Sequence, residues 1–168
     1  NVASGTGPFA LTIDPTGEFL YCANNGATDS ISMYRVDSAT GQLSPLSGSP
    51  YTFTPGANPR SLAADPGGRI LWTVLRGDST LRGLLINRNA SNTVEDGALV
   101  QIATENLVDL PYMVRTAPDG STLYVSIEVT SGLIESYTTL FSSGSLLPLE
   151  TTASGPLTSG IALRSRIQ

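Results

Sequence analysis

Apolar and polar residues alternate along this chain in short stretches that suit β-strands. Residues 31–36 read Ile-Ser-Met-Tyr-Arg-Val, which has the period of two expected for a strand with one face in solvent. Two shorter stretches, residues 10–13 and 18–23, flank the turn sequence Asp-Pro-Thr-Gly at 14–17. Proline presets φ in such a turn, and glycine accepts a positive φ. Periods of 3.6 residues are absent, so we predict an all-β protein.

The same pattern occurs three times, with spacings of 51 and 52 residues. Each copy has a proline at the start of its first strand, a proline and a glycine in the turn, and an aromatic residue in its second strand. These landmarks are Pro8, Pro59 and Pro111; Pro15, Pro66 and Pro118; Gly17, Gly68 and Gly120; and Tyr21, Trp72 and Tyr124. Four landmarks in one register indicate an internal repeat.

Each repeat is long enough for four antiparallel strands, which is the signature of a β-propeller blade. We therefore predict a single, partial β-propeller over residues 1–168. Its blades lie at approximately 8–58, 59–110 and 111–155, and residues 156–168 form an inner strand of a further blade. Propellers close with roughly four to eight blades, and three do not make a ring. The chain is thus either the C-terminal part of a longer propeller or one of several copies that complete a ring.

The aromatic residues at Tyr21, Trp72 and Tyr124 could form a ligand cage or pack between blades. A large residue in the middle of a central strand is usually buried. We interpret all three as packing residues between neighbouring blades.

The composition narrows the classes of partner. The formal net charge is -5, and all nine basic residues are arginines spread along the chain, with no lysine and no histidine. Nucleic acid is a poor partner for such a surface. Cys22 is the only cysteine, so neither an internal disulfide nor a Cys/His zinc site is expected. No apolar stretch reaches the length of about 18 residues that a membrane helix needs. We expect no cofactor and no metal.

The chain opens at Asn1, without an initiator methionine or a signal sequence. Together with the lack of lysine, this favours a chain from which a leader has been removed, or a piece of a longer protein. We expect a secreted or periplasmic protein and leave a cytoplasmic location open.

The repeats resemble the lactonase-type seven-bladed propellers, a family that includes bacterial 6-phosphogluconolactonases and fungal carboxy-muconate cyclases. The resemblance covers residues 7–168. It rests on the blade starts Gly7-Pro8, Asn58-Pro59-Arg60 and Gly155-Pro156, and on the sequence Asp-Pro-x-Gly-x-x-Leu-Tyr at 14–21 with its copies. It implies the fold more strongly than the activity, because one fold hosts many functions. The resemblance also implies a Gly-Pro-Arg-His segment at a blade start in the family's enzymes, with charged side chains converging on the central channel.

The nearest match to that segment is Asn58-Pro59-Arg60-Ser61, in which Ser61 replaces the histidine. The resemblance implies that Arg60 contacts a carboxylate or an oxyanion, because a guanidinium offers a fixed fork of donors. Lactone opening also needs a base that activates water. Without histidine, that base is a carboxylate or lies in blades outside this chain. A serine–histidine mechanism is excluded, so we interpret Ser61 as a small residue of an inner strand.

Repeat alignment places two sets of residues at one end of the propeller channel. Asn25, Arg76 and Glu128 align just after the second strand, and Phe9, Arg60 and Tyr112 align at the blade start. We predict that a polar pocket for a small anionic or sugar-like ligand is lined by Asn25, Arg60, Arg76, Tyr112 and Glu128. Alternatively, Arg76 and Glu128 are solvated loop charges, Arg60 pairs with an acid of the next blade, and Asn25 only forms a turn.

Three functions are compatible with these features. The first is a binding or scaffold module that recognises a small polar ligand or a protein, because no catalytic set is visible. The second is the C-terminal portion of a lactonase-type hydrolase or cyclase acting on a sugar lactone or muconolactone, with Arg60 and Glu128 as candidate catalytic residues. The third is a self-assembling repeat unit, in which further blades come from the same longer chain or from other copies and cover the exposed blade faces.

Overall fold

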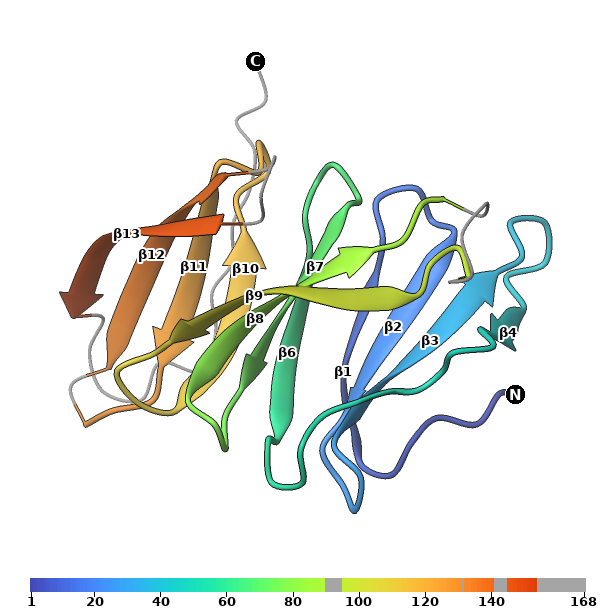
Figure 1. Ribbon diagram of the computed structural model, residues 1–168, viewed down its shortest axis with the longest axis horizontal. Helices are drawn as coiled ribbons and strands as arrows, with labels where there is room; N and C mark the ends of the chain where they lie inside the picture. The colour runs from blue at the N-terminus through green and yellow to red at the C-terminus, as the bar shows by residue number, and fades with distance from the viewer. Residues whose placement is uncertain (90–94, 131, 141–144, 154–168) are drawn as a thin grey trace.

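The chain forms three antiparallel sheets joined by turns and loops (Figure 1). The computed structural model describes residues 1–89, 95–130, 132–140 and 145–153, and this part contains no α-helix. Blade 1 consists of β1 (Pro8–Ile13), β2 (Phe19–Asn24), β3 (Ser30–Val36), β4 (Leu43–Pro45) and β5 (Tyr51–Thr52). Blade 2 consists of β6 (Pro59–Ala64), β7 (Ile70–Leu75), β8 (Thr80–Ile86) and β9 (Leu99–Asn106). Blade 3 consists of β10 (Pro111–Thr116), β11 (Thr122–Ile127), β12 (Leu133–Leu140) and β13 (Ser145–Ala153).

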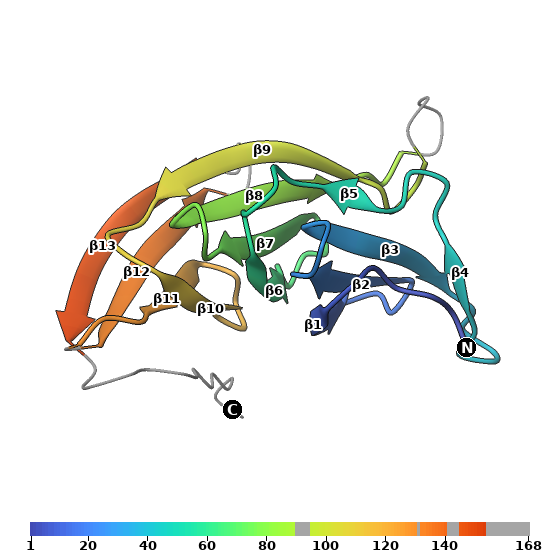
Figure 2. The ribbon, with the colours of Figure 1, turned by 90° about the horizontal axis from the view of Figure 1, so that it is seen from below.

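The three sheets stand side by side in an open arc (Figure 2). The first strand of each blade, β1, β6 or β10, lies on the concave side, and β9 and β13 lie on the convex side. This arrangement confirms the predicted all-β architecture of propeller blades. The further inner strand predicted at 156–168 lies outside the described residues. Within the described part, no helix is long and apolar enough to cross a membrane.

The turn between the first two strands is held by its aspartate. Asp14 accepts a hydrogen bond from the backbone N–H of Phe19 at 2.7 Å, and Asp65 accepts one from Ile70 at 2.6 Å. Both aspartates are buried. These bonds therefore give the carboxylates and the backbone N–H groups partners in a place that water does not reach. Ala117 stands at the third position, where the turn is held by backbone hydrogen bonds and by Asp119, which accepts from the N–H of Ser121 at 3.0 Å.

The outer edge of blade 1 differs from the single fourth strand that the sequence predicts. Two short strands, β4 and β5, pair with opposite ends of β3. Between them, the side-chain oxygen of Ser49 accepts the N–H of Met33 at 2.9 Å in place of a backbone carbonyl. Pro45 and Pro50 border this gap. Because proline has no N–H to donate to a ladder, the two prolines favour a break in the outer strand here.

Two layers of apolar side chains fill the spaces between the blades. Tyr21 lies in the layer between blades 1 and 2, and Trp72 lies in the layer between blades 2 and 3. Both are at most 1% exposed, which confirms their predicted role in packing. The Tyr21 hydroxyl donates to the carbonyl of Gly97 in blade 2 at 2.8 Å, and burial raises its pKa. Tyr124 is half-buried and belongs to neither layer within the described residues, so its packing between blades stays a prediction.

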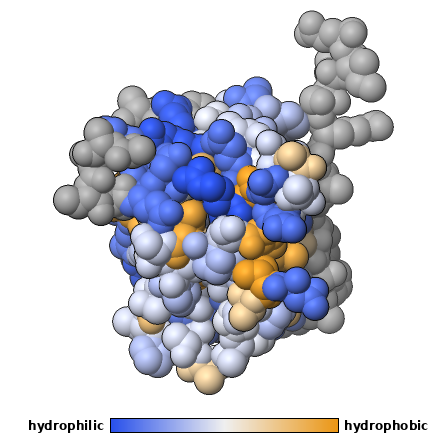
Figure 3. All heavy atoms as spheres, turned by 90° about the vertical axis from the view of Figure 1, so that its right-hand side faces the viewer, coloured by the Kyte–Doolittle hydropathy of each residue, from blue (hydrophilic) through white to orange (hydrophobic). Residues whose placement is uncertain are grey.

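Blade 1 exposes part of the face that has no neighbouring blade. Phe9, Leu11 and Ile13 alternate along β1 and are 45%, 67% and 51% exposed. Figure 3 looks onto this side of the molecule and shows apolar areas separated by polar ones. The aligned residues of blade 2, Leu62 and Ala64, pack instead against blade 1. The face of β1 that is exposed in blade 1 is therefore equivalent to the face of β6 that is buried in blade 2.

Candidate functional site

A β-bulge occurs at the same place in all three blades. The pairing register shifts between Pro8 and Ala10, between Pro59 and Ser61, and between Pro111 and Met113. The extra residues in the inner strands are therefore Phe9, Arg60 and Tyr112, the set that the repeat aligns at the blade start. A bulge bends its strand and redirects the side chain. The local backbone thus turns these three side chains away from the ordinary pleat.

Arg60 lies between the other two redirected side chains. Its guanidinium carbon is 4.4 Å from the centre of the Phe9 ring and 5.5 Å from the centre of the Tyr112 ring. Both distances are within the range of a cation–π interaction. The Nε atom of Arg60 is buried and has no hydrogen-bond partner within the described part of the chain. The rings hold the guanidinium in place without using its hydrogen-bond donors.

These residues line a cavity of about 250 Å³ beside the inner strands, here called the inner-strand pocket. Its lining includes Phe9, Leu11, Arg60, Ser61, Tyr112 and Arg115. No carboxylate is among the described residues that line it. The alternative in which Arg60 pairs with an acid of a neighbouring blade has no support, because no such ion pair is present among the described residues. The pocket therefore carries positive charge in a protein whose net charge is -5.

The serine that replaces the family's histidine is bound to the next blade. The N–H of Val114 donates to Ser61 Oγ at 3.2 Å, and Arg115 Nη1 lies 3.4 Å from the same oxygen. Ser61 is 4% exposed. This geometry fits the interpretation of Ser61 as a small residue that joins two inner strands. Among the described residues, no hydrogen-bond partner of its hydroxyl is a side-chain base.

The second aligned set lies at the same end of the blades. The backbone N–H groups of Asn25, Arg76 and Glu128 each donate to the carbonyl before the inner strand of their own blade, at 3.0, 3.0 and 2.8 Å. The Arg76 guanidinium is paired with the Glu128 carboxylate across blades 2 and 3. None of the three is among the described residues that line the inner-strand pocket. The structure thus places Arg60 and Tyr112 together, and Arg76 with Glu128 as a separate pair.

Sequence reasoning missed Arg115. It lies on β10, and its side chain reaches Ser61 on β6. The aligned residues in blades 1 and 2 are Thr12 and Ala63, so an arginine at this position of an inner strand was the available signal. The most regular motifs of the repeat lie at the blade start and after the second strand, and position 115 belongs to neither.

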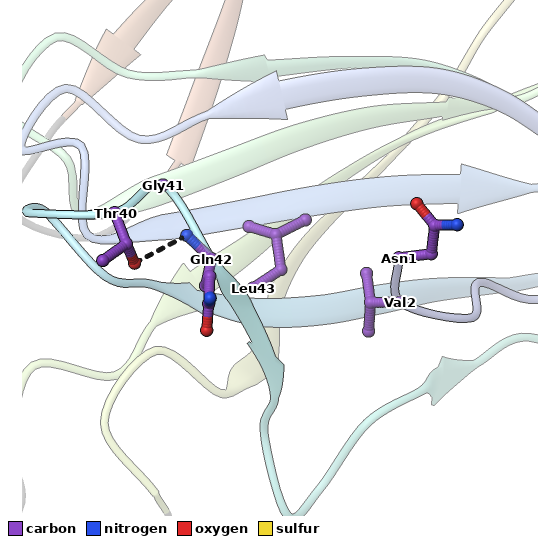
Figure 4. A pocket seen from close by; sticks show the side chains of 6 residues that line it. All are labelled: Asn1, Val2, Thr40, Gly41, Gln42 and Leu43. Carbon is purple, nitrogen blue, oxygen red and sulfur yellow. Dashed lines mark hydrogen bonds between the residues drawn. The ribbon is translucent and has the colours of Figure 1, made fainter.

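Two other cavities have no basic side chain in their described lining. One of about 490 Å³ lies between the N-terminal segment and the turn before β4 (Figure 4), and none of its lining side chains is charged. Another of about 300 Å³ lies between blades 2 and 3 and contains Glu105 and Glu135. The Tyr137 hydroxyl donates to Glu135 at 2.6 Å, and burial together with this carboxylate raises the pKa of Tyr137. Among the described residues, no three metal-binding side chains lie together.

The repeated four-stranded blades, with a bulge at each blade start, define a β-propeller, and the candidate pocket lies beside its inner strands. Residues 2–93 match the family model described as "Lactonase, 7-bladed beta-propeller". The chain belongs to this lactonase family of seven-bladed propellers, as the resemblance predicts. No curated protein sequence matches it significantly.

Solved structures show the same fold at low sequence identity. A candidate 6-phosphogluconolactonase from Bacteroides uniformis superposes with a TM-score of 0.76 at 17% identity, over 91% of this chain and 43% of that one. One from Bacteroides fragilis gives 0.76 at 19%, over 94% and 48%. A periplasmic gluconolactonase from Pseudomonas aeruginosa gives 0.71 at 20%, over 89% and 42%. The chain thus spans less than half the length of these proteins.

Proposed function

We propose that this chain supplies a binding surface of a lactonase-type propeller, in which the inner-strand pocket holds a small anionic, sugar-acid-like ligand. The proposal rests on the position of the Arg60 guanidinium and on its lack of a described acidic partner. Its guanidinium is held between two rings, its Nε has no partner in the described chain, and no described carboxylate lines the pocket. A carboxylate ligand would satisfy these donors in a charge-assisted, two-point contact.

The shape of the pocket supports a ligand with both apolar and polar faces. Phe9 and Tyr112 offer ring surfaces, and Arg60 offers the charge. A sugar acid combines C–H faces with a carboxylate, which suits such a lining. Lactonase-type neighbours, named for gluconolactone or its 6-phosphate, favour this ligand class over a peptide.

Binding through Arg60 is tested by titrating the chain with D-gluconate in a calorimeter. Arg60→Met removes the charge but keeps an apolar side chain between the rings, so we expect affinity to fall by roughly tenfold or more. The control is Arg82→Gln. Arg82 pairs with Asp78 and is not in the pocket lining, so its loss leaves affinity unchanged. Equal affinity of the Arg60→Met variant and the parent chain would contradict the proposal.

The second candidate function is hydrolysis of a sugar lactone, which the family and the names of its neighbours favour. Arg60 would then stabilise the developing oxyanion. The candidate base Glu128 is bound to Arg76, so this alternative needs a base from elsewhere or an opening of that pair. The same two variants decide it in a pH-stat assay with D-glucono-δ-lactone. Turnover that survives Arg60→Met unchanged excludes Arg60 from the reaction.

Further blades packing against β1 are a third proposal, supported by the exposed Leu11 and Ile13. If they come from other copies, light scattering at micromolar concentration is expected to give a dimer or larger. Leu11→Asp then gives a monomer, because it places a charge on the apolar face. Val108→Asp is a matched control, since Val108 is equally exposed at 67% but lies after β9. A folded monomer of the parent chain would show that copies do not complete the ring.

A further inference from the structure

The inner-strand pocket holds a second guanidinium that the family resemblance does not account for. Arg115 Nη1 donates to the carbonyl of Val114 at 2.8 Å and lies 3.4 Å from Ser61 Oγ. A guanidinium carries five N–H donors on three nitrogens. The other two nitrogens of Arg115 have no hydrogen-bond partner among the described residues, and no described acid forms an ion pair with it.

Two arginines therefore share one cavity of about 250 Å³ without a described carboxylate in its lining. They come from neighbouring inner strands, Arg60 from β6 and Arg115 from β10. Two like charges in a partly enclosed, low-dielectric space repel each other, and an anion between or beside them relieves that repulsion. The energetic gain is greatest for a ligand that meets each guanidinium with its own negative group.

We infer that Arg115 is a specificity-determining contact that makes the inner-strand pocket prefer doubly charged acids over singly charged ones. This rests on the proposed function, in which Arg60 binds the first carboxylate. Arg115 binds the second anionic group, a phosphate monoester or another carboxylate. The Ser61 hydroxyl and the Val114 carbonyl position Arg115 for this contact by fixing one of its nitrogens.

The competing explanation is that Arg115 only joins β10 to β6 through Ser61. The two explanations differ in what a neutral replacement does. Gln at position 115 can still donate to the Val114 carbonyl, so it retains a structural bond while removing the charge. A purely structural residue would then affect the two kinds of ligand equally, whereas a specificity residue affects only the doubly charged one.

The experiment compares D-gluconate with 6-phospho-D-gluconate by calorimetry at one fixed ionic strength. The parent chain is expected to bind the phosphorylated acid at least about tenfold more tightly. Arg115→Gln removes this preference by weakening the phosphorylated acid alone, and Arg115→Lys restores part of it. Arg60→Met weakens both ligands. Thermal unfolding of each variant confirms that it is folded.

The outcomes separate the inference from the proposed function. If both ligands bind but Arg115→Gln leaves their ratio unchanged, the role of Arg115 is wrong and the proposed function stands. If neither ligand binds to the parent chain, the proposed function is wrong and the inference falls with it. Inorganic phosphate that competes with 6-phosphogluconate but not with gluconate would further support a separate phosphate contact at Arg115.

Discussion

Replacing Trp72 with alanine is expected to lower the free energy of unfolding by about 3–5 kcal/mol. Trp72 is 1% exposed, belongs to the apolar layer between blades 2 and 3, and lies against Gly83, where an added Cβ would be 2.7 Å from the indole. Its removal leaves a cavity that two separate sheets line. Each sheet is held by its own ladder, so neither can easily move to fill the space. Urea unfolding, followed by circular dichroism, measures the change.

Tyr124 provides the matched control, because it occupies the same position in the third repeat but is half-buried. The same substitution there is expected to lower the free energy of unfolding by about 1 kcal/mol or less. A loss of only about 1 kcal/mol for Trp72→Ala would contradict its assignment to packing between blades. Equally large losses at both positions would instead imply that Tyr124 is covered in solution by another blade.

Replacing Arg88 with methionine is expected to destabilise the chain by about 1–3 kcal/mol at neutral pH. Arg88 follows β8 and reaches across to blade 1, where Nη2 lies 2.5 Å from Asp14 and Nη1 lies 3.2 Å from Glu18. Asp14 is 1% exposed, so without Arg88 a buried carboxylate loses its ion-pair partner. Its remaining hydrogen bonds come from Thr16 and Phe19. These limit the loss.

The effect of Arg88→Met is also expected to depend on pH. Burial acts to raise the pKa of Asp14, but the hydrogen bonds from Thr16, Phe19 and Arg88 outweigh it, and the pKa lies below its ordinary value. A carboxyl group with a lowered pKa stabilises the folded state above its unfolded pKa. This contribution is lost as the pH falls through the folded pKa. The difference between variant and parent should therefore shrink below about pH 4.

Urea unfolding at several pH values tests this prediction. Arg82→Gln is the control, since Arg82 pairs with the partly exposed Asp78 at 3.7 Å, and such pairs contribute roughly 0–1 kcal/mol. A destabilisation by Arg88→Met that is the same at pH 3 and pH 7 would show that Arg88 acts by packing alone. Its stacking over the Phe19 ring at 5.0 Å would be the contact responsible.

The turn and strand elements could be predicted well from local sequence, for a physical reason. Gly17, Gly68 and Gly120 all have φ between 66° and 75°, which glycine adopts without strain. Each such turn ends one strand and starts the next, so its spacing predicts the blade. The outer edge of blade 1 could not be predicted from local sequence in the same way. The gap between β4 and β5 depends on the Ser49 side chain, whose oxygen takes the place of a backbone carbonyl as hydrogen-bond acceptor.

The candidate site was predicted only in part. Repeat alignment placed Phe9, Arg60 and Tyr112 at equivalent positions, but their stacking depends on bulges that bring side chains of three blades together. Arg76 and Glu128 were expected in the same pocket as Arg60, yet they form a separate pair. Arg115 lies between the repeat landmarks Pro111 and Pro118 but is not itself repeated, and only the path of its side chain brings it to Ser61.

The sequence by itself determined the repeat, the class of fold and the family, because proline, glycine and aromatic residues act through local geometry and repeat at a constant spacing. Only the tertiary structure decided which charges are paired. Arg88 binds Asp14 across 74 residues of sequence, and Arg76 binds Glu128 across 52. Arg60 and Arg115, by contrast, meet no described acid. The sequence shows how many arginines there are, but the packing of blade against blade determines which of them remain unpaired and available for a ligand.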